Sequence, residues 1–73
     1  MGNATLSSLI KMVNQIADNN VHVGTTDDAA NAVASHITRF WARPMKQQIN
    51  EYLNEGGEEL NEIARQAVTQ LQK

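Results

Sequence analysis

Hydrophobic residues recur at helical spacing in four stretches of the chain. In each stretch the apolar positions follow the i, i+3, i+4, i+7 pattern, which places them on one face of an α-helix, with polar residues opposite. The pattern predicts helices over about residues 4–19, 26–42, 44–55 and 61–72. The connections between them are short. The chain, residues 1–73, is therefore predicted to be one all-α domain, a small bundle of three to four short helices.

The residues at the predicted helix ends support these boundaries. Thr26 is a favourable N-cap for the second helix. That helix is expected to end near residue 42, because the residue before Pro44 is pushed out of the helical region. The pair Gly56–Gly57 stops the third helix. The fourth helix begins either at Glu58 or after Asn61, and the strong preference for Asn at the N-cap favours Asn61.

Composition and charge exclude several classes of protein. The chain contains no cysteine, which excludes disulfides and thiolate metal sites. Six basic residues against eight acidic ones give a formal charge of −2, which argues against a general nucleic-acid binder. No apolar run is long enough to cross a membrane, and no secretory signal is visible, so a cytoplasmic protein is expected. A chain this short has a small core and gains stability from a partner.

The sequence contains no arrangement typical of an active site. His22 and His36 lack a metal-binding spacing, and the serines lie in predicted helices without an oxyanion-type glycine motif. There is no phosphate-binding loop, and the lone glycine pair is typical of a helix stop. We therefore predict no catalytic, cofactor-binding or metal-binding residue in this chain, and no enzymatic activity of the chain on its own.

The charges are separated along the chain. No acidic residue lies between Asp28 and Glu51, and the basic residues of this window are Arg39, Arg43 and Lys46. From Glu51 to Glu62 there are five glutamates and no basic residue. One interpretation is that the arginines complement the C-terminus of a helix. The other is that the two charged patches orient the protein against a larger partner.

The adjacent aromatic residues Phe40 and Trp41 are the second prominent feature. Neighbouring helical positions are about 100° apart, so a small bundle does not readily cover both side chains. One or both are expected to anchor the core, and an exposed aromatic residue beside arginines is typical of a protein–protein hot spot. The predicted partner-binding residues are Arg39, Phe40, Trp41, Arg43 and Met45.

An ordered set of short motifs resembles the delta subunit of NAD-dependent formate dehydrogenases that contain molybdenum or tungsten. The matching residues run in order from about Met12 to Leu71: Lys11 to Ala17 (KMVNQIA), His36-Ile37, Phe40-Trp41, Pro44-Met45, Gly56-Gly57 and Leu60. The chain departs from the family at Asn19 and Asn20, where aromatic residues are common, and at Ala42 to Met45 (ARPM), where Asp-Pro-Arg-Met is common.

The resemblance implies a small accessory or assembly subunit that docks on the large catalytic subunit and stabilises the complex. It also implies that the molybdenum pterin, iron–sulfur clusters, FMN and NAD are bound by partner subunits, and that this chain holds no cofactor. Two alternatives come from the residues alone. One is a small helical regulatory or DNA-binding module around Pro44, and the other is a self-associating domain that forms a homodimer when isolated.

Overall fold

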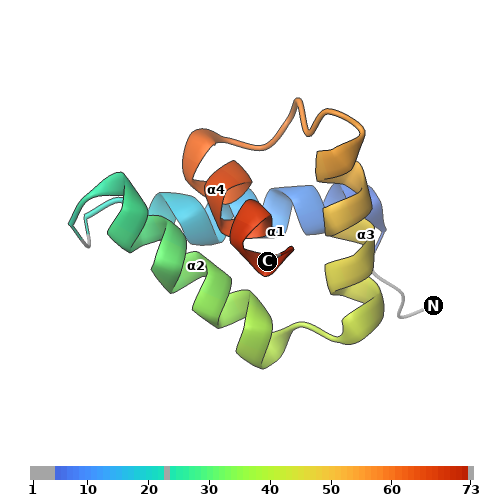
Figure 1. Ribbon diagram of the computed structural model, residues 1–73, viewed down its shortest axis with the longest axis horizontal. Coiled ribbons are helices and arrows are strands. Elements are labelled where there is room, and N and C mark those ends of the chain that lie inside the picture. Colours follow the sequence, from blue (N-terminus) through green and yellow to red (C-terminus); the bar gives the residue numbers. More distant parts are fainter. Residues whose placement is uncertain (1–4, 23, 73) are drawn as a thin grey trace.

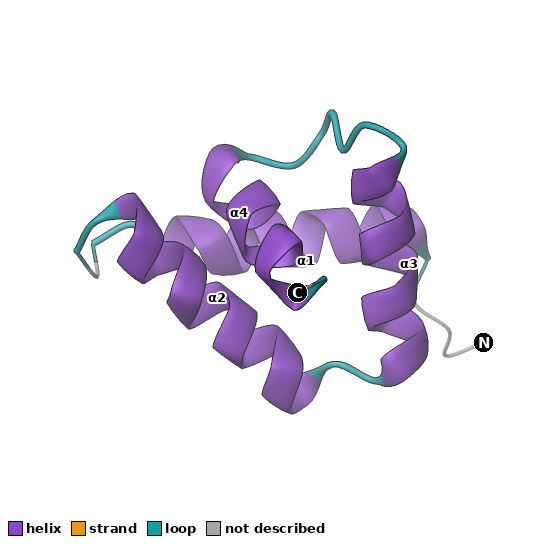
Figure 2. Cartoon of the chain, in the orientation of Figure 1, coloured by secondary structure: helices purple, strands orange, loops and turns teal. Residues whose placement is uncertain are grey.

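The chain forms four helices joined by short connections, in a computed structural model that describes residues 5–22 and 24–72 (Figure 1). The helices are α1 (Leu6–Asn19), α2 (Thr26–Phe40), α3 (Arg43–Asn54) and α4 (Glu62–Leu71). All regular structure in these residues is helical (Figure 2), so the predicted all-α bundle is confirmed. The predicted start of the first helix at residue 4 lies outside the described residues; within them, α1 begins after the N-cap Thr5.

The last helix, α4, is the central element of the bundle. α4 packs against each of the other three helices, most extensively against α2, while α1 runs behind it and α3 stands to one side (Figure 1). Its inner face is made of small and branched residues that allow close approach: Ala64, Ala67 and Val68 are all fully buried. The arrangement places the connection between α2 and α3 at one end of α3 and the connection between α3 and α4 at the other (Figure 1).

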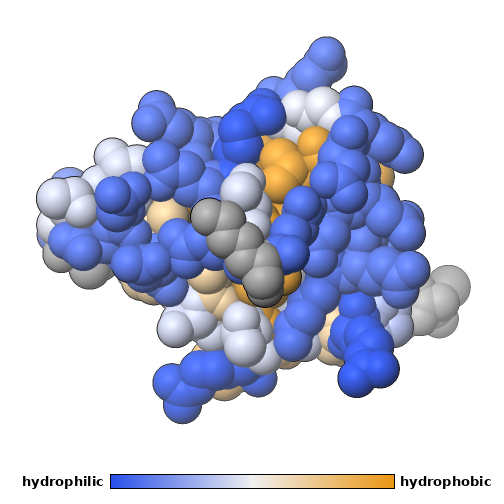
Figure 3. Space-filling view, viewed as in Figure 1, coloured by the Kyte–Doolittle hydropathy of each residue, from blue (hydrophilic) through white to orange (hydrophobic). Residues whose placement is uncertain are grey.

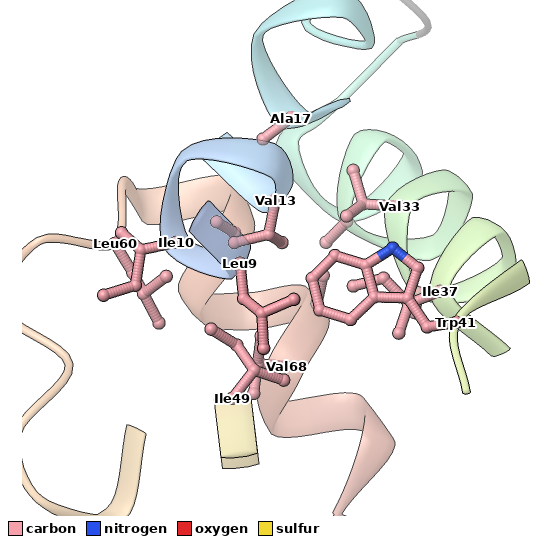
Figure 4. Close-up of a cluster of buried hydrophobic side chains, with 14 residues drawn as sticks. Leu9, Ile10, Val13, Ala17, Val33, Ile37, Trp41, Ile49, Leu60 and Val68 are labelled. Atoms are coloured by element: carbon pink, nitrogen blue, oxygen red, sulfur yellow. The ribbon is translucent and has the colours of Figure 1, made fainter. Parts of the chain in front are cut away.

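The core is a single apolar cluster to which all four helices contribute (Figure 4). Its largest fully buried side chains are Leu9, Val13, Val33, Ile37, Ile49 and Val68. These residues belong to the predicted apolar stripes, since they recur at helical spacing along their elements. Outside the core, the face in Figure 3 is mainly hydrophilic, with an apolar strip in the hollow between α3 and α4.

The second helix begins with a capping box. Thr25, rather than the predicted Thr26, is the N-cap: its hydroxyl accepts a hydrogen bond from the Asp28 backbone N–H at 3.1 Å. The Asp28 carboxylate in turn accepts from the Thr25 N–H at 3.2 Å. The prediction of Thr26 was therefore wrong by one residue. The reciprocal pair satisfies two backbone donors at the helix start, and it requires an acidic or amide residue three positions after the cap.

The two adjacent threonines provide a matched test of this cap. We expect Thr25→Ala to lower the free energy of unfolding by about 1 kcal/mol, because the Asp28 N–H loses the hydroxyl that accepts its hydrogen bond. Thr26→Ala, one residue further on, is expected to change it by less than about 0.5 kcal/mol. Urea denaturation of the two variants measures the difference. Equal effects of the two substitutions would contradict the assignment of the cap.

The third helix ends at Asn54, one residue before the predicted end, and the fourth begins after Asn61, the favoured cap. The backbone N–H of Gly57 donates to the Tyr52 carbonyl at 3.1 Å, and that of Gly56 donates to the Leu53 carbonyl at 3.0 Å. This is the hydrogen-bond pattern of a Schellman motif. Both glycines have positive φ angles, 130° and 58°, which other residues adopt at a cost. Asn61 then caps α4, its side-chain oxygen accepting from the Ala64 N–H at 2.8 Å.

Candidate docking site

The junction between α2 and α3 is built by two extended residues. α2 ends at Phe40, two residues earlier than predicted, because Trp41 and Ala42 have ψ angles of 138° and 157°. Pro44 then lies in the first turn of α3, where its missing N–H costs nothing. The early end lets Trp41 leave the helical path and direct its indole into the core, toward α1 (Figure 4). Burial of this indole offsets the loss of helical hydrogen bonds where α2 ends.

Lys46 is a basic residue of α3 that hydrogen-bonds to the C-terminal turn of α2. Its ammonium group donates a hydrogen bond to the Thr38 carbonyl at 3.0 Å, and Thr38 is among the last residues of that helix. A cation at this place satisfies a free carbonyl and complements the negative end of the helix dipole. The sequence suggests this role for Arg39 and Arg43 as well. Arg39 lies in the last turn of α2, exposed and over an aromatic ring, whereas Arg43 is exposed at the start of α3.

The two adjacent aromatic residues have opposite environments. Trp41 is 5% exposed and belongs to the core, whereas Phe40 is 69% exposed and is the most exposed large hydrophobic residue of the described chain. The prediction that one of the pair anchors the core is confirmed. Met45 is half-buried and packs against the core. Of the five predicted partner-binding residues, the structure therefore leaves Arg39, Phe40 and Arg43 fully at the surface.

The Phe40 ring is flanked by charged and aromatic neighbours. The imidazole of His36, one turn earlier, lies 4.9 Å from it between ring centroids, with the planes inclined by 46°. The Arg39 guanidinium carbon lies 5.8 Å from the ring centroid, within the range of a cation–π interaction. We call His36, Arg39, Phe40 and Arg43 the basic–aromatic surface. The i, i+4 spacing of His36 and Phe40 was the signal for their contact.

The opposite end of α3 carries an acidic loop, residues 55–61. Its glutamates, and Glu51 and Glu62 beside it, are exposed. The loop itself is held by side chains of its neighbours. Arg65 donates to the Gly56 and Gly57 carbonyls at 2.9 and 2.7 Å. The Tyr52 hydroxyl accepts from the Glu59 N–H at 2.9 Å. The acidic loop is thus anchored by side chains from both helices that it connects, Tyr52 of α3 and Arg65 of α4.

Asn14 of α1 ties this loop to the rest of the bundle. Its side-chain NH₂ donates to the Glu59 carbonyl at 2.8 Å, and its side-chain oxygen accepts from the Asn61 N–H at 2.9 Å. The Asn61 side chain returns two longer contacts, to the Asn14 carbonyl at 3.4 Å and to Asp18 at 3.3 Å. The sequence analysis does not predict that Asn14 bonds to this loop. The available signal is its position, a polar residue at the edge of the apolar stripe of α1.

The described residues offer little else that resembles a site. An open groove of about 560 Å³ lies between α2 and α4, lined by Asn31, Ala34, Ser35, Thr38, Arg39, Gln70 and Leu71. Across residues 5–22 and 24–72, no group of three or more His, Cys, Asp or Glu side chains is placed to hold a metal ion. No helix in the described part of the chain combines the length and the apolar character needed to cross a bilayer.

The fold and the surface define a small helical protein with an exposed aromatic residue among basic groups at one end and an anchored acidic loop at the other. The sequence model of one protein family, described as the NADH-dependent formate dehydrogenase delta subunit FdsD, matches residues 8–68. The match covers most of the chain, and the chain therefore belongs to this family of formate dehydrogenase delta subunits. No curated protein and no solved structure matches the chain significantly.

Proposed function

We propose that this chain is a non-catalytic accessory subunit of a soluble, cytoplasmic NAD-dependent formate dehydrogenase. It docks on the large catalytic subunit and stabilises the assembled complex. The family assignment supports membership of such a complex. The observation that carries the docking role is Phe40, a large apolar side chain that is 69% exposed. The Arg39 guanidinium lies over its ring, and a second exposed arginine, Arg43, follows three residues later in the chain. Aromatic residues, phenylalanine included, and arginine are enriched at protein–protein interfaces.

The proposed mechanism is stabilisation by mass action. A subunit that binds the assembled form more tightly than the separate subunits shifts the equilibrium toward that form, by an amount that grows with its concentration relative to its Kd. The chain itself contributes no chemistry in this proposal. The molybdenum pterin, iron–sulfur clusters, FMN and NAD are bound by the partner subunits, and the residues of this chain act on the reaction only through the integrity of the complex.

The structure favours docking on a protein surface over the DNA-binding alternative. A recognition helix starting near Pro44 would rely on Lys46, but this side chain is engaged at the end of α2. The second half of α3 continues into the acidic end of the molecule, with Glu51 and Glu55 exposed. Acidic residues along the presented face repel the phosphate backbone.

Phe40→Ala tests the docking role directly. We expect the affinity for the purified large subunit to fall by about fivefold or more, because truncating an interface anchor costs more than about 1 kcal/mol. The thermal stability of the free chain is expected to stay nearly unchanged, since the ring is largely in solvent. Titration calorimetry or biolayer interferometry measures the first quantity, and a thermal melt measures the second.

Met12→Ala is the control, because Met12 is an exposed hydrophobic residue, 38% accessible, that belongs to α1 and not to the basic–aromatic surface. It is expected to leave the affinity unchanged. Failure of the wild-type chain to bind any subunit of the complex would refute the proposed function. Equal effects of the Met12 and Phe40 substitutions would place the interface elsewhere on the molecule.

A further inference from the structure

Phe40 is held in a defined position although it is exposed. The His36 ring packs against it at 4.9 Å, and the Arg39 guanidinium lies 5.8 Å from its centroid. Two neighbours therefore limit the rotation of a side chain that is mostly in solvent. A side chain ordered before binding loses less conformational entropy when it enters a partner's pocket. The restricted ring is therefore suited to enter a pocket on a partner, rather than to pack against a flat surface.

The charge around Phe40 has one sign. Between Asp28 and Glu51 the chain has no acidic residue, although its overall formal charge is −2. Arg39 and Arg43 are exposed on either side of the ring in sequence, and Lys46 adds a third cation at the same junction. The glutamates of the acidic loop lie at the far end of α3 (Figure 1). The local potential at the junction is consequently positive, opposite to that of the whole molecule.

We propose that the basic–aromatic surface recognises an apolar pocket rimmed by carboxylates on a partner subunit. Phe40 fills the pocket, and Arg39 and Arg43 pair with the acidic rim. Arginine suits this task because its planar guanidinium can make two parallel hydrogen bonds to one carboxylate. This inference rests on the proposed function, since it specifies the chemistry of the surface on which the subunit docks.

A second copy of this chain is a poorer occupant of the same surface. A two-fold dimer through Phe40 would bring each arginine near the arginines of the other copy, because a two-fold interface pairs the same patch with itself. Like charges placed together across an interface are destabilising. The arrangement thus selects against self-pairing and in favour of an acidic partner.

The test compares association rates at different salt concentrations. The full chain and a double variant, Arg39→Glu with Arg43→Glu, are bound to formate dehydrogenase purified without this subunit. At low salt we expect the double variant to associate at least about tenfold more slowly, because electrostatic steering becomes repulsion. The wild-type rate is expected to fall steeply between about 0.05 and 0.5 M salt, and the two rates are expected to converge at the upper end.

Lys11→Glu is the control, because Lys11 is an exposed cation on α1. It changes the net charge without changing the basic–aromatic surface, so we expect a much smaller effect on the rate. Thermal melts of all variants establish that each is folded.

The outcomes separate this inference from the proposed function. Binding by the wild-type chain that is indifferent to salt and to the double reversal would overturn the acidic pocket and leave the accessory role intact. Absence of binding by the wild-type chain would overturn both. Light scattering that shows a Phe40-dependent homodimer, with large-subunit binding unaffected by Phe40→Ala, would also overturn the inference, because the occupant would then be a second copy.

Discussion

Trp41→Ala is expected to lower the free energy of unfolding by about 3–5 kcal/mol, the usual cost of truncating a buried tryptophan. Trp41 is 5% exposed and lies in the central cluster with residues of every helix. It is also the residue at which the chain leaves α2, so its indole stabilises the junction as well as the core. A domain of 73 residues has about 4–11 kcal/mol of stability in total. The loss is therefore a large share of the total, and the variant is expected to melt well below the wild type.

Circular dichroism during thermal and urea denaturation measures this loss. Trp41→Phe keeps most of the apolar volume and is expected to retain the fold with a smaller loss of stability. The neighbouring Phe40→Ala is expected to melt close to the wild type, although it removes an equally apolar ring. A Trp41→Ala variant as stable as the wild type would contradict the burial of the indole.

The pair of variants also separates two causes of lost binding. A partner affinity reduced by Trp41→Ala is expected to recover when the chain is assayed under conditions where the variant is folded, because the defect is one of stability. The reduction caused by Phe40→Ala is expected to persist under all conditions. Persistent loss of affinity with a fully folded Trp41→Ala variant would show that the indole contacts the partner after rearrangement of the junction.

Asn14→Ala is expected to cost about 2 kcal/mol and to loosen the acidic loop. Both polar atoms of this side chain bond to backbone groups of the loop and its end, the Glu59 carbonyl and the Asn61 N–H. The Asn61 contact is partly buried, so its N–H does not easily find water in exchange, and an unsatisfied buried group costs about 1–3 kcal/mol. For a domain of this size, such a loss lowers Tm by roughly 8–16 °C.

Gln15→Ala is the control for this prediction, since Gln15 is the exposed neighbour of Asn14 on α1. It is expected to change the free energy of unfolding by less than about 0.5 kcal/mol. Hydrogen exchange provides a second readout, because the amide N–H groups of Glu59 and Asn61 should exchange faster in the Asn14 variant than in the wild type. Unchanged protection of the Asn61 amide would argue against the proposed anchor.

Much of the fold was accessible from local patterns. The spacing of apolar residues predicts all four helices, because burial of one face is the main stabilising term and its period is a property of the α-helix. The Schellman stop at Gly56–Gly57 and the N-cap at Asn61 follow from backbone preferences of single residues. The separation of charge into two windows is likewise visible in the chain itself.

The cap of α2 shows that residue type alone does not place a helix start. Thr25 and Thr26 are both good N-caps by residue type. Asp28 stands three positions after Thr25, whereas Ala29 stands three positions after Thr26, so only Thr25 can form the capping box. The spacing of the two residues, rather than the cap residue by itself, contains the information.

The division of roles between Phe40 and Trp41 was decided only by the packing of the helices. Both residues are apolar and adjacent. Trp41 points into the core only because the helix ends at Phe40 and the backbone of Trp41 is extended, and residue type does not predict that end. The bond from Asn14 to Glu59 spans 45 positions, and no local rule pairs residues so far apart. Helical periodicity depends on residues three and four positions apart, so the sequence alone determines which face of each helix is apolar. Which side chains meet, and which remains in solvent, depends on how four helices fill a shared volume, and that is settled only when they pack.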